Sequence, residues 1–279
     1  MTELDRRFLI SGAAALAAAP LSSEAHPMTD IPAAWRGSEQ IAMLVYPGMT
    51  ALDLIGPQHF FASLMGAKVH LVGKTADPVV SDTGVRITPS ATFDTCPRDL
   101  AVLFAPGGTA GTLAAMRDRA TRDFMADRGA RATWVTSVCT GSLILGAAGL
   151  LDGYRATSHW AARDALADFG ATPTDARVVE DRNRVTGAGV TSGLDFGLTM
   201  VARLRDPTYA RAVQLQAEYD PHPPFASGSP HTATADVQAI VRPMLAGFAD
   251  QARAVARDLK HSPSNSAALR GANPEGEVQ

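Results

Sequence analysis

Cysteine is scarce in this chain of 279 residues, which contains only Cys96 and Cys139. Two cysteines cannot form the disulfide framework of a small secreted domain, nor a zinc site built from cysteine ligands. The 7 histidines are scattered, without a pair at i, i+4 and without an acidic partner at metal-ligand spacing. We therefore expect neither a catalytic metal nor another cofactor.

The chain also has no large excess of charge of one sign, because its 25 Lys and Arg nearly balance its 28 Asp and Glu, which gives a net charge of −3. This balance excludes the basic surface that nucleic acids require, so a small neutral or weakly charged molecule is the expected partner. The chain lacks the GxSxG motif of α/β-hydrolases. Its composition, 46% hydrophobic and 19% charged, is typical of a globular domain with a sizeable core.

The N-terminal 25 residues are predicted to be an export signal. Arg6 and Arg7 precede a hydrophobic run over 8–21, and residues 23–25 (SEA) form a small-x-small cleavage site. The paired arginines followed by Phe8 and Leu9 resemble a twin-arginine signal, which predicts a periplasmic or exported protein. The alternative is a mis-assigned start codon with a disordered, Ala-rich leader and a cytoplasmic protein. The run is too short for stable membrane insertion.

Apolar strand-like runs alternate with helical segments over residues 40–259, which we expect to form the domain proper, and the polar residues 261–279 are predicted to be a disordered tail. The predicted strands are 41–46, 68–72, 100–105 and 133–138, with a hairpin over 79–89 and a two-stranded turn over 177–186. The predicted helices are 58–65, one from 111, 121–129, 143–148, one ending at 169, 194–204, 209–219 and 237–259.

Cys139 lies where the strand 133–138 turns sharply into a helix. At the first turn of a helix, free N–H groups and the helix dipole favour thiolate over thiol, which is how a fold activates a nucleophile. Thr140 and Gly141 can present N–H groups to a developing negative charge. The alternative is a small buried core cysteine, and local features do not decide between the two.

Other candidate residues also follow predicted strands. Asp53 comes just past the first strand, on the side of an α/β sheet where ligands bind, although spacing alone favours a helix cap. Gly107 and Gly108 follow the strand 100–105 and form either an anion-binding nest or a tight βα turn. For His159, a position in the wall of the site or in the core is favoured over a general base. Cys96, in a loop, is predicted to be structural.

The glycines at 187, 189 and 193 form a GxGxxxG string that superficially suggests dinucleotide binding. It comes late in the chain, and no βαβ unit with an acidic residue about twenty positions on follows it. We do not expect a nucleotide site.

Taken together, several motifs resemble the DJ-1/PfpI superfamily over residues 40–245, most of all its isonitrile hydratases. These motifs are 52–57 (LDLIGP), 106–108 (PGG), 137–142 (SVCTGS), 147–151 (AAGLL), 156–160 (ATSHW), 214–219 (QLQAEY) and 223–225 (PPF). The resemblance implies a flavodoxin-like α/β fold, with a doubly wound, mostly parallel sheet, helices on both faces and a homodimeric assembly.

The resemblance also implies roles for the candidate residues. Cys139 would be the nucleophile, Asp53 the acid beside it, and Gly108 and Thr140, with Gly107 adjacent, the donors to an oxyanion or substrate. Peptidase-like members carry histidine directly after the cysteine, where this chain has Thr140, so a Cys-His peptidase is not expected. The implied activity is hydration of isonitriles to formamides. The alternatives are glyoxalase- or deglycase-like chemistry, or a non-catalytic redox-sensing or ligand-binding domain.

Overall fold

The computed structural model describes residues 31–261. The predicted export signal, residues 1–25, lies outside the described residues, as does the predicted tail except for His261. Within the described range, no helix is both long enough and apolar enough to cross a membrane.

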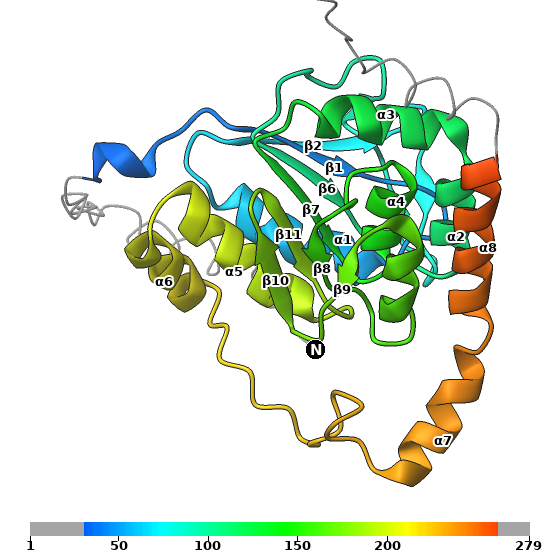
Figure 1. The fold of residues 1–279 in the computed structure, drawn as a ribbon. Helices are drawn as coiled ribbons and strands as arrows, with labels where there is room; N and C mark the ends of the chain where they lie inside the picture. Colours follow the sequence, from blue (N-terminus) through cyan, green and yellow to red (C-terminus); the bar gives the residue numbers. More distant parts are fainter. Residues whose placement is uncertain (1–30, 262–279) are drawn as a thin grey trace, which may run out of the picture. The chain divides into compact units, whose positions relative to one another are not determined.

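The centre of the fold is a seven-stranded sheet in the order β10-β11-β7-β6-β1-β2-β5 (Figure 1). Only β10 runs antiparallel to its neighbour, β11, and the other neighbouring pairs are parallel. The strands are β1 (Gln40–Leu44), β2 (Lys68–Gly73), β5 (Ala91–Thr92), β6 (Val102–Ala105), β7 (Trp134–Val138), β10 (Val178–Asp181) and β11 (Arg184–Gly187). The sheet confirms the predicted mostly parallel α/β fold.

Helices cover both faces of this sheet because the chain winds from β1 to β2 in one direction and from β6 to β7 in the other. On one face α1 (Ala51–Ala62) packs against α5 (Ser192–Leu204), which α6 (Pro207–Gln216) also contacts. The other face carries α2 (Ala110–Arg117), α3 (Arg119–Gly129), α4 (Gly141–Ala147) and α8 (Phe248–His261). The winding reverses between β1 and β6, so their carboxyl ends border the crevice where ligands bind in such sheets.

The remaining elements are short. They are η1 (Ala33–Trp35), the 3₁₀ helix η2 (Arg163–Phe169), α7 (Ala235–Met244), the antiparallel pair β3 (Val79–Val80) and β4 (Arg86–Ile87), and the parallel pair β8 (Arg155–Ala156) and β9 (Thr172–Pro173). The pair β3–β4 confirms the predicted hairpin, and Gly84 in its turn has a φ of 86°.

Two helix predictions were wrong in their bounds. Helix α1 begins at Ala51 instead of Gln58, because Pro57 lies inside it and does not mark its start. The buried side chains Leu54 and Phe60 hold this helix on the sheet and on α5, which offsets the hydrogen bond lost at the proline. The predicted helix 237–259 is divided into α7 and α8 at Gly247, whose φ of 80° ends a right-handed helix.

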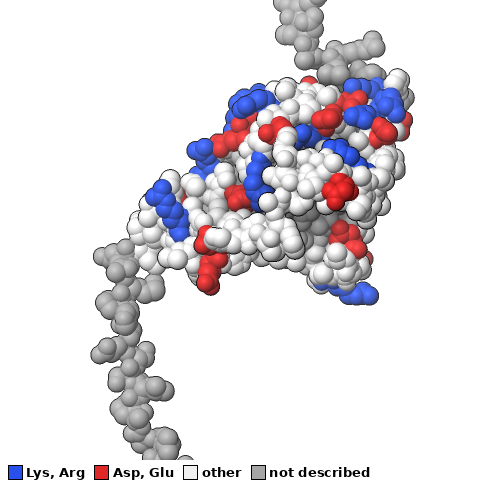
Figure 2. All heavy atoms as spheres, turned by 90° about the horizontal axis from the view of Figure 1, so that it is seen from below, with Lys and Arg blue, Asp and Glu red and all other residues white. Residues whose placement is uncertain are grey.

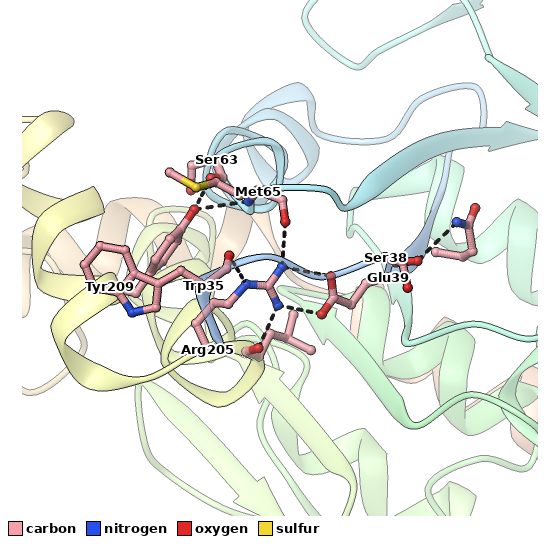
Figure 3. A network of polar contacts seen from close by, with 9 residues as sticks. Trp35, Ser38, Glu39, Ser63, Met65, Arg205 and Tyr209 are labelled. Carbon is pink, nitrogen blue, oxygen red and sulfur yellow. Dashed lines mark hydrogen bonds and ion pairs between the residues drawn. The ribbon is translucent and has the colours of Figure 1, made fainter. Parts of the chain in front are cut away.

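The segment before β1 is fastened by a buried guanidinium (Figure 3). Arg205, at the end of α5, makes two hydrogen bonds with Glu39, of 2.5 and 2.9 Å. It also donates to the carbonyls of Trp35, Leu204 and Met65. Its side chain is only 2% exposed, and every N–H of the guanidinium has an acceptor, so the charge is compensated.

Candidate active site

The carboxyl ends of β1, β6 and β7 bring the sequence-predicted residues together. Asp53 lies in the first turn of α1 after β1, Gly107 and Gly108 follow β6, and Cys139 follows β7. These strands are neighbours in the sheet, which is why residues far apart in the sequence meet here.

The backbone of Cys139 is held in the left-handed conformation, which residues other than glycine rarely adopt. Its φ is 57°, and its side chain is buried, with 5% of the residue exposed. Its carbonyl accepts hydrogen bonds from the hydroxyls of Ser142 (3.2 Å) and Ser158 (3.0 Å). A side chain at Gly141 would lie 2.1 Å from the Ala105 carbonyl oxygen, so only glycine permits this turn. Strain that the surroundings maintain in this way is typical of functional positions.

Asp53 does not cap its helix, contrary to the interpretation that spacing alone favoured. The N-cap is Thr50, without a side-chain cap, and Asp53 points at the site because its helix starts earlier than predicted. Its Oδ2 accepts a 3.0 Å hydrogen bond from the Gly107 N–H, while its buried Oδ1 has no partner among the described residues. Burial raises the pKa of Asp53 from 3.8 to about 7, although hydrogen bonding by Cys139 and Gly107 opposes the rise.

The surroundings of the Cys139 thiol oppose the lowered pKa that a helix N-terminus alone predicts. Burial and the charge of Asp53 raise its pKa well above the usual value, while the N–H groups of Thr140 and Val190 oppose the rise. Helix α4 is short, so its dipole is weak against these effects. Two negative charges are disfavoured in so small a buried space. The thiol and the carboxyl therefore titrate as a coupled pair that retains one proton near neutral pH.

The turn over residues 106–108, the glycine turn, supports this pair. Gly107 donates its N–H to Asp53, and Gly108 donates its N–H to Thr140 Oγ1 at 2.9 Å. Both N–H groups thus have acceptors within the protein, and a role for Gly108 as an oxyanion donor stays a prediction. A side chain at Gly107 would lie 2.5 Å from the Thr140 nitrogen and 2.8 Å from Asp53 Oδ2, so this position has room only for glycine.

Sequence reasoning missed Val190. It lies just after β11, next to β7 in the sheet, and its N–H acts on the Cys139 sulfur. The only signal was the glycine string at 187, 189 and 193, which keeps this segment close to its neighbours. A side chain at Gly193 would lie 3.2 Å from Pro57, and one at Gly189 would lie 2.9 Å from the His159 ring.

A cleft of about 630 Å³ is lined in part by Ser158, His159, Trp160 and Val190, and neither Cys139 nor Asp53 contributes to its wall. His159 lies in this wall, as one of the favoured interpretations has it, and burial lowers its pKa. Its Nδ1 accepts a hydrogen bond from the Ala161 N–H at 3.3 Å.

The second cysteine does not belong to this site. Cys96 is buried in the core, and its carbonyl accepts a hydrogen bond from the buried Arg128. Across residues 31–261, no three His, Cys, Asp or Glu side chains are grouped as metal ligands would be. On the face shown in Figure 2, acidic and basic side chains are interspersed.

The chain is similar to several proteins of one known family. The model of the DJ-1/PfpI family matches residues 39–203. An isonitrile hydratase from Pseudomonas putida is 52% identical over 198 residues, which are 71% of this chain and 86% of that protein.

Solved structures give the same picture. The crystal structure of a ThiJ/PfpI family protein from Pseudomonas syringae superposes with a TM-score of 0.80 at 64% identity, covering 84% of this chain and 98% of that one. Drosophila melanogaster DJ-1beta superposes with a TM-score of 0.61 at 20% identity, covering 66% of this chain and 100% of that one, which shows the shared fold alone.

Proposed function

This chain belongs to the DJ-1/PfpI family, and from that premise we propose that it hydrates isonitriles to N-substituted formamides, with Cys139 as nucleophile and Asp53 as proton donor. Its similarity to an isonitrile hydratase supports the reaction type. The observation that carries the proposal is a buried carboxyl with a pKa of about 7 beside a cysteine on a strained turn. Such a pair holds one proton and one negative charge, which are the two things that the first step consumes.

In the first step, the Cys139 sulfur attacks the terminal carbon of R–N≡C. The sulfur lone pair forms the C–S bond, and the carbon lone pair takes the proton from Asp53 to give a thioimidate, R–N=CH–S–Cys139. Before attack the thiol passes its proton to the Asp53 carboxylate, and the N–H groups of Thr140 and Val190 stabilise the thiolate that forms. The unpartnered Asp53 Oδ1 is the oxygen free to carry the proton.

In the second step, water adds to the thioimidate carbon while Asp53, now a carboxylate, accepts one proton from it. The other water proton reaches the nitrogen, the C–S bond breaks, and the product R–NH–CHO leaves. Asp53 regains its proton and Cys139 its thiolate, so one water is consumed in each cycle. The R group would occupy the cleft beside Val190.

The test is turnover of an aryl isonitrile by the full chain, with the formamide followed by mass spectrometry. Cys139→Ala should abolish formamide formation and leave no covalent adduct. Cys96→Ala removes the other cysteine, which is buried in the core away from the pair, and should keep the activity. Full activity in Cys139→Ala would rule out the covalent route.

The same assay separates the alternatives. Turnover of a small dicarbonyl, with no formamide from any isonitrile, would favour glyoxalase- or deglycase-like chemistry. Rapid peroxide modification of Cys139 without either turnover would favour redox sensing.

We also propose a homodimer. Helix α7 has no buried residue, and it exposes Ile240 (67%) and Met244 (77%). An apolar helix face in water is favourable only when something covers it, and a second copy would do so. Sedimentation of the full chain tests this proposal.

Cleavage after residue 25, measured by N-terminal sequencing of protein from the periplasm, tests the proposed export signal.

A further inference from the structure

Three buried hydroxyls lie in a row behind the reactive pair. Tyr46 follows β1, Thr112 lies on α2, and Thr140 follows Cys139. The Tyr46 hydroxyl lies 3.0 Å from Thr112 Oγ1, and Thr112 Oγ1 lies 3.0 Å from Thr140 Oγ1. No step of the proposed reaction uses Tyr46 or Thr112.

The single hydrogen of the Thr140 hydroxyl sets the direction of the hydrogen bonds in this row. The Thr140 hydroxyl donates to the Gly108 carbonyl at 2.6 Å, and a hydroxyl has a single hydrogen to donate. Thr140 must therefore accept from Thr112 as well as from the Gly108 N–H. Tyr46 donates its single hydrogen to the Pro106 carbonyl at 2.9 Å, and its oxygen lies 3.0 Å from Thr112 Oγ1. The hydrogen bonds therefore run from Thr112 to Thr140 and on to the Gly108 carbonyl, while Tyr46 bonds the Pro106 carbonyl beside Thr112.

This row holds the glycine turn at both ends. Tyr46 contacts Pro106 and Thr140 contacts Gly108, while Gly107 between them donates to Asp53. At the other side of the site, Thr140 directly follows Cys139, and its N–H acts on the sulfur. Tyr46 and Thr112 therefore act on both members of the pair through the turn 106–108 and Thr140.

We propose that Tyr46 and Thr112 are positioning residues, whose hydroxyls fix the turn 106–108 and Thr140 and thereby hold the Asp53 carboxyl and the Cys139 thiol in place for reaction. For turnover this proposal rests on the proposed isonitrile hydration. For the reactivity of the thiol it stands independently of the substrate.

The test is Thr112→Val, which keeps the shape and removes the donor to Thr140. We expect kcat to fall by roughly three- to tenfold, the value of one hydrogen bond, with KM within about twofold. Thr112→Ser should restore kcat, because it keeps the hydroxyl. The matched control is Thr136→Val on β7, which also removes a buried threonine hydroxyl bonded to a carbonyl, that of Leu103 (2.9 Å), and should leave kcat unchanged.

A second readout does not depend on turnover. Alkylation of Cys139 by iodoacetamide across pH, with the Cys139 peptide resolved from that of Cys96 by mass spectrometry, reports on the pair directly. In Thr112→Val the midpoint should move upward by roughly half a pH unit or more, because a looser turn weakens the N–H contacts to carboxyl and sulfur. Thr136→Val should show the wild-type midpoint.

If Thr112→Val does not fold, Tyr46→Phe tests the same row. Its control is Tyr209→Phe, which removes a hydroxyl bonded to the Ser63 carbonyl (2.6 Å) in the network of Figure 3. Row variants that match their controls in kcat and in alkylation midpoint would overturn the proposal. If the wild type forms no formamide, the proposed function fails, while the alkylation midpoints still decide the role of the row.

Discussion

Replacing Asp53 by asparagine should make the stability of the folded chain less sensitive to pH. In the wild type, burial raises the pKa of this carboxyl from 3.8 to about 7. Between these two pH values the unfolded chain has lost the proton while the folded chain keeps it, so the free energy of unfolding falls as pH rises. The loss is complete above the folded pKa and absent below the unfolded one. Asparagine does not titrate and removes this slope.

The magnitude follows from the shift. One pKa unit corresponds to about 1.4 kcal/mol, so a shift of roughly three units makes the wild type lose ~4 kcal/mol between about pH 4 and pH 7 relative to the variant. An asparagine amide placed where Oδ1 has no partner adds a constant cost of about 1–3 kcal/mol. A constant cost shifts the difference between the proteins but does not change its slope.

The assay is urea unfolding of the wild type and Asp53→Asn at half-unit steps from pH 4 to pH 8. Taking the difference cancels every other group that titrates identically in both proteins. Asp99→Asn, at a side chain that is 82% exposed, controls for the change in net charge. A difference that varies by less than about 1 kcal/mol over this range would refute a buried, protonated Asp53. The same variant should turn over isonitriles slowly, because asparagine donates no proton to the substrate carbon.

Two further changes test other parts of the structure. Gly107→Ala places a methyl group 2.8 Å from Asp53 Oδ2 and 2.5 Å from the Thr140 nitrogen, which displaces the reactive pair. We expect the kcat of this variant to be about 100-fold lower than that of the wild type, with the fold of the variant checked by circular dichroism. Unchanged kcat would contradict the tight turn. Arg205→Met leaves the Glu39 carboxylate without its partner and should lower the free energy of unfolding by about 3 kcal/mol in urea titrations. As a control, Arg119→Met breaks the exposed pair Arg119–Asp123 and should lower the free energy of unfolding by under about 1 kcal/mol. Equal losses in the two variants would contradict the buried character of the Arg205 pair.

Most of the architecture was predictable because it follows from patterns of apolar and turn-forming residues close together in the sequence. The runs that became β1 and β6 are apolar at nearly every position, as strands covered on both faces must be, and a Pro-Gly pair follows each of them. Prediction failed where tertiary contacts outweigh local signals. The helix predicted to begin at residue 58 begins at Ala51, because packing against the sheet and α5 keeps Pro57 within α1.

The sequence by itself determined the two candidate reactive residues, since Cys139 on a strand–helix turn and Asp53 after the first strand follow from local order and family motifs. Only the tertiary structure decided how they behave. A helix N-terminus favours a thiolate, but burial beside each other raises the pKa of both the Cys139 thiol and the Asp53 carboxyl. The contributions of Val190, Tyr46 and Thr112 depend on the order of the strands. Such contacts join residues distant along the chain, and hydrogen bonds and dielectric screening depend on distance in space.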